Sequence, residues 1–108
     1  MFNKNSRYIS RQVNEEVDIR LQLSIWTLID ILKDKGKVEL DYLQIFQLKK
    51  EGNLIRVEHE QEVPKYRSVH MIEANDIQLD EVVKIYVIDN GIEGSVMIFP
   101  SEYWYRGS

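Results

Sequence analysis

The residues best suited to chemistry stand close together in the run His59-Glu60-Gln61-Glu62. This run resembles the start of the zinc-protease motif HExxH, in which a helix stacks two histidines one turn apart around the metal. The motif needs its second histidine at position 63, where Val63 stands. The segment also alternates like a strand, which sends His59 and Glu60 to opposite faces. The sequence therefore predicts no metalloprotease.

A looser site remains open, because His59 and His70 could meet across neighbouring strands with Glu62 as a third metal ligand. The alternative is that these residues form a solvated polar strand face. The serines lie in no GxSxG elbow, the glycines in neither GxGxxG nor GxxxxGK[ST], and the chain has no cysteine. We therefore expect no catalytic residues, no resident metal and no cofactor, and we expect the protein not to be an enzyme.

Nucleic-acid binding is a second possibility, since Lys65-Tyr66-Arg67 interleaves cations with an aromatic ring. A sheet that presents such residues could stack single-stranded bases. Against this, 14 Lys and Arg face 18 Asp and Glu, for a net charge of −4. We keep nucleic-acid binding as an unfavoured alternative, because bulk charge gives no attraction to a phosphate backbone.

Large aromatic residues near the C-terminus favour partner binding more strongly. Tyr103, Trp104 and Tyr105 are consecutive, so a single strand cannot turn all three inward. Exposed Tyr and Trp side chains anchor interfaces. Together with Trp26 they are the candidate interface residues, unless the tail folds back over the helix and covers Trp26.

The clearest element that would position these residues is a helix starting near Asp18 and ending before Gly36. Its core face repeats at helical spacing, and its ends carry the acidic, basic and glycine residues that helix ends prefer. A second apolar series, Ile19, Leu23 and Trp26, widens the apolar arc. Either the helix is deeply embraced within one small domain, or a second copy of the chain covers its outer flank.

Strand patterns occupy most of the rest of the chain. We expect strands over residues 6–10, 39–49, 54–61, 66–72, 82–88 and 95–99, with the polar stretch 11–16 between the first strand and the helix. A change of parity near Leu43 suggests a bulge. Gly52-Asn53 and Asn90-Gly91 predict hairpin turns, and Pro64 ends a strand.

Composition agrees with a sheet, because 10 Val and 13 Ile stand against one Ala. We predict one α+β domain over residues 1–108, a mainly antiparallel sheet of about five to six strands with one long helix packed on a face. No apolar run is long enough for a membrane span, and residues 1–10 lack the apolar stretch of a secretory signal. We therefore expect a cytoplasmic protein with no membrane partner.

Several short motifs occur in an order that resembles a known bacterial family. They are Tyr8-Ile9, Leu21-Gln22-Leu23, Trp26, Leu28-Ile29-Asp30, Asp41-Tyr42-Leu43-Gln44, Gln61-Glu62-Val63-Pro64 and Tyr66. The pattern spans roughly Tyr8 to Tyr103 and resembles the Firmicute family catalogued as domain of unknown function 960, at times carried on staphylococcal cassette elements. That resemblance implies no activity, catalytic residue or cofactor. The surplus of apolar surface, together with the lack of a reactive set of residues, favours a non-enzymatic interaction module that self-associates or binds another protein.

Overall fold

The computed structural model describes residues 1–103, which fold into a six-stranded sheet with helices and short 3₁₀ turns. The strands are β1 (Arg7–Ile9), β2 (Leu43–Glu51), β3 (Leu54–Gln61), β4 (Tyr66–Glu73), β5 (Val83–Asp89) and β6 (Ser95–Ile98). The helices are α1 (Arg11–Glu16) and α2 (Ile19–Lys35), and the 3₁₀ turns are η1 (Gly91–Glu93) and η2 (Pro100–Glu102).

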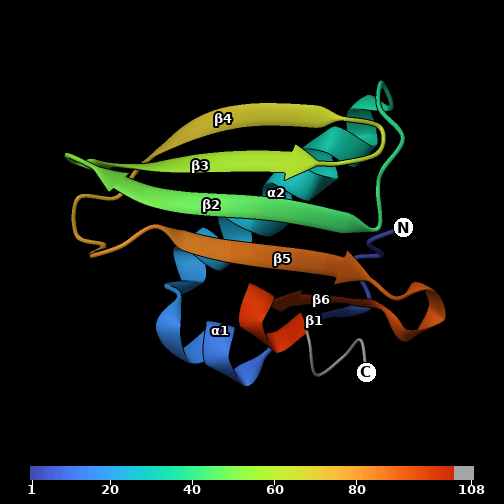
Figure 1. Cartoon of the computed structure of the whole chain (residues 1–108), viewed down its shortest axis with the longest axis horizontal. Helices are drawn as coiled ribbons and strands as arrows, with labels where there is room; N and C mark the ends of the chain where they lie inside the picture. The colour runs from blue at the N-terminus through green and yellow to red at the C-terminus, as the bar shows by residue number, and fades with distance from the viewer. Residues whose placement is uncertain (104–108) are drawn as a thin grey trace.

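The strands lie in the order β1-β6-β5-β2-β3-β4, which places β2 near the middle and β4 at one edge (Figure 1). Every pairing is antiparallel except that of β1 with β6. The β2–β3 and β5–β6 hairpins follow the two turn signals in the sequence. The α+β prediction is confirmed, with one parallel pair at the edge.

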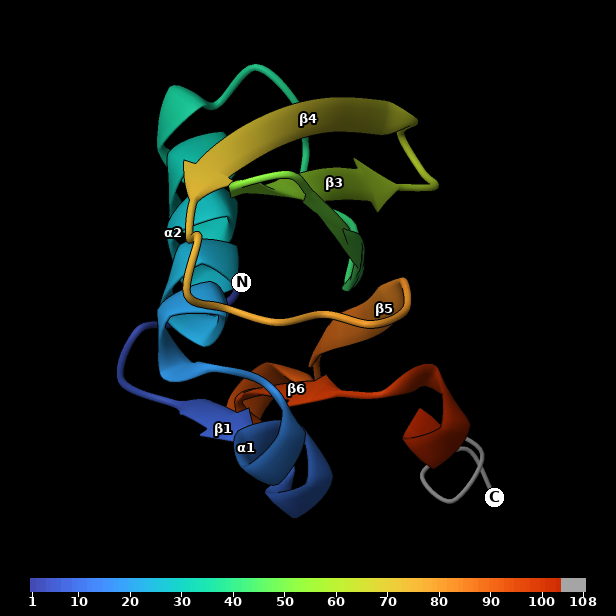
Figure 2. The same ribbon diagram turned by 90° about the vertical axis from the view of Figure 1, so that its left-hand side faces the viewer.

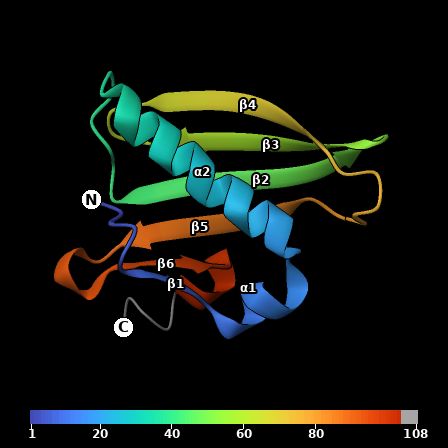
Figure 3. The same cartoon turned by 180° about the vertical axis from the view of Figure 1, so that it is seen from behind.

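Helix α2 crosses one side of the sheet diagonally (Figure 3). The Asp18 carboxylate accepts a hydrogen bond from the Arg20 amide at 2.8 Å, and Gly36 closes the helix with a left-handed φ of 64°. Its core face includes Leu21, Ile25 and Ile29, all essentially inaccessible to solvent. The helix expected from the sequence is therefore confirmed at both ends.

The two faces of the sheet differ sharply. On the side covered by α2, which we call the helix face, successive strands bury Phe46, Val57 and Ile85 in one cluster. The sheet curves around α2 so that this side is concave (Figure 2). The other side, which we call the open face, carries Arg56 and Glu58 on β3 because neighbours along a strand alternate between faces.

Two expected features differ in the structure. Residues 11–16 form α1, where the sequence suggested only a polar connection, because Ser10 caps the helix by accepting from the Val13 amide at 3.2 Å. The strand expected from residue 39 begins at Leu43, and its pairing with β3 and β5 runs without a bulge. The parity change near Leu43 therefore marks a strand start. Within residues 1–103, no helix is long and apolar enough to cross a membrane.

Candidate functional site

His59 lies on the helix face and is only 1 % exposed, so it is not part of a solvated polar strand. Its ring stacks on Phe46 with the centroids 4.3 Å apart, and Tyr66 meets it edge-on at 5.6 Å. Burial lowers the pKa of His59 from 6.5 to about 4, and nearby His70 adds to this shift. The neutral imidazole is therefore part of the core.

Two glutamines next to His59 complete a buried hydrogen-bond chain. Gln44 uses its amide nitrogen to donate to the Asp41 carbonyl at 2.9 Å and to Gln61 Oε1 at 2.8 Å. Its Oε1 therefore faces His59 Nε2, 2.6 Å away, and must accept from it. This orientation assigns the neutral His59 tautomer that carries its proton on Nε2.

Gln61 joins the loop before β2 to the turn after β3. Its Nε2 donates to the carbonyls of Glu39 at 2.9 Å and Pro64 at 2.8 Å, while its Oε1 accepts from the Asp41 amide at 3.0 Å. Each of these partners is a backbone group that would otherwise need water. The side-chain amide groups of Gln44 and Gln61 therefore have hydrogen-bond partners on both their nitrogen and their oxygen atoms.

We expect Gln61→Ala to lower the free energy of unfolding by about 2 kcal/mol, because it leaves backbone groups of two loops and the Gln44 amide without their partner. Urea unfolding followed by circular dichroism measures the loss. Gln47→Ala is the matched control, since Gln47 is a half-buried β2 residue on the open face. An equal loss in both variants would contradict the structural role of Gln61.

The three proposed metal ligands are not brought together. His59 is tied to Gln44, His70 Nε2 lies 2.9 Å from Ser68 Oγ, and Glu62 is exposed in the turn after β3. No three His, Asp or Glu side chains in residues 1–103 lie close enough to hold a metal ion.

The residues proposed to bind nucleic acid are also dispersed. Tyr66 faces His59 in the interior, whereas Arg67 lies on the open face and pairs with Glu58. Glu58 also pairs with Arg56 at 3.3 Å. Lys65 lines a hollow of about 470 Å³ in which Glu60 and Glu62 balance Lys65 and Lys84. The charges of this region are therefore largely compensated.

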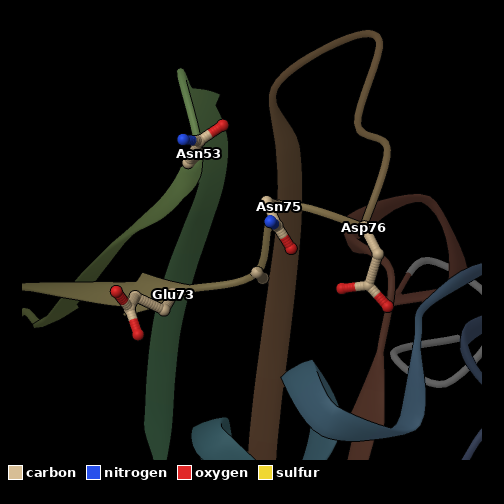
Figure 4. Close-up of a pocket in the computed structure, with 5 residues that line it drawn as sticks. Asn53, Glu73, Asn75 and Asp76 are labelled. Atoms are coloured by element: carbon tan, nitrogen blue, oxygen red, sulfur yellow. The ribbon is translucent and has the colours of Figure 1, made fainter.

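A second hollow, of about 330 Å³, lies beside the β2–β3 turn and is shown in Figure 4. Asn53, Glu73, Asn75 and Asp76 line it. Both carboxylate oxygens of Asp76 accept from Arg20 at 3.1 Å, which also pairs with Asp18. The acid group therefore fastens the β4–β5 loop to the start of α2.

The candidate interface residues lie in different environments. Trp26 is 8 % exposed and packs in the core, with the Arg7 guanidinium 4.7 Å from its ring centroid. Tyr103 lies on the open face against Tyr86 at 6.0 Å, so at this residue the tail does not cover Trp26. The Tyr42 hydroxyl donates a hydrogen bond to Tyr103, which raises the pKa of Tyr42. Trp104 and Tyr105 lie outside the described residues.

Apolar side chains that do reach the surface lie elsewhere. Ile19, Leu23 and Ile31 lie on α2 at spacings of four and eight residues, and all three are exposed, Leu23 by 58 %. We call these three residues the α2 row. On β4, Val69 is 39 % and Met71 47 % exposed on the open face. The second apolar series in the sequence points to Ile19 and Leu23, whereas Val69 and Met71 stand only in a weak strand pattern.

Comparison with other proteins adds family membership but no activity. A crystal structure of a protein of unknown function from Enterococcus faecalis has the same fold, with a TM-score of 0.74 and 27 % identity over 94 % of this chain and 93 % of that chain. A search of curated proteins found no similar sequence. The model of a family described as "Staphylococcal protein of unknown function (DUF960)" matches residues 6–102. This match confirms the resemblance seen in the sequence motifs, and the chain belongs to that family.

Proposed function

We propose that this protein is a non-enzymatic, cytoplasmic interaction module that self-associates. The observation that carries the proposal is the apolar surface that one copy leaves open on regular elements, namely the α2 row and the β4 residues Val69 and Met71. Exposed apolar groups gathered on one element are typical of surfaces that another protein covers. A second copy is the partner we favour, since β4 is also an edge strand of the sheet that residues 1–103 form.

The polar residues support a structural role over a catalytic one. His59 is committed to Gln44, His70 to Ser68, and Arg67 to Glu58. General acid–base catalysis needs a titratable group within reach of a substrate and a pKa near the working pH. His59 is buried and its pKa is about 4, so this histidine is poorly suited to such a role near neutral pH.

Sedimentation equilibrium over a range of protein concentrations tests the proposal. We expect the mean mass to rise from that of one chain to that of two as concentration increases. A single-chain mass at every concentration would contradict it.

Matched glutamate substitutions identify the surface that is used. We expect Val69→Glu to weaken self-association about tenfold or more, because it places a charge within an apolar contact. Leu23→Glu should likewise weaken self-association if the α2 row forms the contact. Ile92→Glu is the control, since Ile92 is fully exposed in η1, far along the chain from both surfaces. Unchanged association in both test variants would show that neither apolar surface mediates self-association.

A further inference from the structure

The free edge of β4 offers a second copy a complete strand to pair with. This strand has eight residues and ends the sheet, whereas β1 at the other edge has three. No other strand of residues 1–103 lies beyond β4 (Figure 1). A long edge strand presents a row of unpaired amides and carbonyls, which natural proteins usually shorten, cover or pair.

The backbone groups that point outward from β4 can be assigned. The Ala74 amide donates to the Asn53 carbonyl at 3.2 Å, so Ala74 points towards β3. Because backbone direction alternates along an antiparallel ladder, the even-numbered residues of β4 also point towards β3. The amides and carbonyls of Arg67, Val69, Met71 and Glu73 therefore point outward, and no hydrogen bond outside the ladders reaches them within residues 1–103.

We propose that two copies of the chain pair their β4 strands antiparallel about a twofold axis at His70, a proposal that rests on the self-association inferred above. His70 then lies opposite the partner's His70. Val69 lies opposite the partner's Met71, and Arg67 lies opposite the partner's Glu73. Twofold symmetry repeats the last two contacts, whereas the pair of His70 residues lies on the axis.

This register satisfies the backbone and the side chains together. The four outward-pointing residues of each strand fall opposite one another, so each pair exchanges two hydrogen bonds, about eight in all. On the open face, the apolar Val69 meets a methionine, and the cation of Arg67 meets a carboxylate. Arg67 is about half exposed while bound to Glu58, which leaves room for a second acidic partner.

Neighbouring registers fit less well. A twofold axis at Val69 would set Arg67 opposite Met71, and an axis at Met71 would set Val69 opposite Glu73. Each also leaves one of the four outward-pointing residues of each strand without a partner. Charge and length together therefore select the axis at His70.

The pairing also fixes where the helices lie. A twofold axis between antiparallel edge strands runs perpendicular to the sheet, so both α2 helices lie on the same side of one continuous sheet. The C-terminal end of α2 lies near the start of β4 (Figure 3), so the two helix ends lie towards opposite ends of the paired strands. Two α2 rows would thus be displayed on one side of the assembly.

A single cysteine tests the register directly, because the natural sequence has none. Directly opposed residues at non-hydrogen-bonded positions have Cα atoms about 4.5 Å apart, which a disulfide can bridge. We expect His70→Cys to form a covalent dimer under mild oxidation. Ser68→Cys or Ile72→Cys alone should not, but a mixture of the two should cross-link, because Ser68 lies opposite the partner's Ile72. The mixture also keeps the test open if His70→Cys fails to fold.

Charge exchange provides an independent readout by sedimentation. Arg67→Glu or Glu73→Arg alone should weaken the dimer about tenfold, because each sets like charges opposite one another twice. The double variant should restore it. The register would be overturned if the protein dimerises but neither His70→Cys nor the mixture of Ser68→Cys and Ile72→Cys forms a cross-link, and the double charge variant does not restore the dimer. Self-association would then still stand. A monomer at all concentrations would overturn self-association itself.

Discussion

Gly94→Ala lowers the free energy of unfolding by about 3 to 5 kcal/mol, the largest loss we expect from any single methyl group in this chain. Gly94 has a φ of 95° and a ψ of −169°, a region that is almost exclusive to glycine. A Cβ there would lie 2.4 Å from the Ser6 carbonyl oxygen and 2.9 Å from the Tyr8 ring. That same oxygen accepts the Ser95 amide at 2.9 Å, so displacing it disturbs the start of the β1–β6 pairing.

Gly52→Ala is the matched control for this prediction. Gly52 also has a positive φ, 61°, but an added Cβ there meets nothing within 4 Å. The cost is therefore backbone strain alone, about 1 kcal/mol. Urea denaturation of both variants and the parent measures the difference. If both substitutions cost the same, steric contact at β1 would not be what selects glycine at position 94.

Local patterns in the sequence are sufficient to predict the long helix and the hairpins. Asp18 and Gly36 bracket an apolar repeat that only a helix satisfies, and the β2–β3 turn at Gly52 has the residues its backbone requires. The parallel pairing of β1 with β6 could not be predicted in this way. It joins strands more than eighty residues apart and depends on the close approach at Gly94.

The interior was harder to predict than the elements. The sequence favours a solvated strand face for His59, because isolated polar residues in a strand are usually solvated. His59 is instead buried together with Gln61, because the Gln44 side chain bonds the histidine and loop backbone groups bond the glutamine. Trp26, a candidate interface residue in the sequence, is buried for a similar reason, because Arg7 covers its ring. Such partnerships arise between residues distant in sequence, which periodicity along one segment does not report.

The same burial makes stability depend on pH in a predictable direction. In the folded chain the pKa of His59 is about 4, against about 6.5 when unfolded, so the unfolded state binds the additional proton throughout that interval. Stability from the neutral ring is fully present above pH 6.5 and falls as pH decreases towards 4, by about 3 kcal/mol. Asp18 and Asp76 affect stability in a lower pH range than His59 does. Hydrogen bonds from Arg20 lower the pKa of both carboxyls, so their contribution falls only below about pH 4.

We therefore expect the free energy of unfolding, measured by urea denaturation at steps from pH 7 to pH 4.5, to decline most steeply in the parent chain and in His70→Gln. His59→Gln should be less stable at pH 7, because it loses the stacking on Phe46. Its stability should nevertheless vary less with pH, since the buried titrating group is gone. Parallel curves for the parent and His59→Gln would show that acid destabilises this fold through other groups. Curves that converge as the pH falls would identify the buried imidazole as the cause.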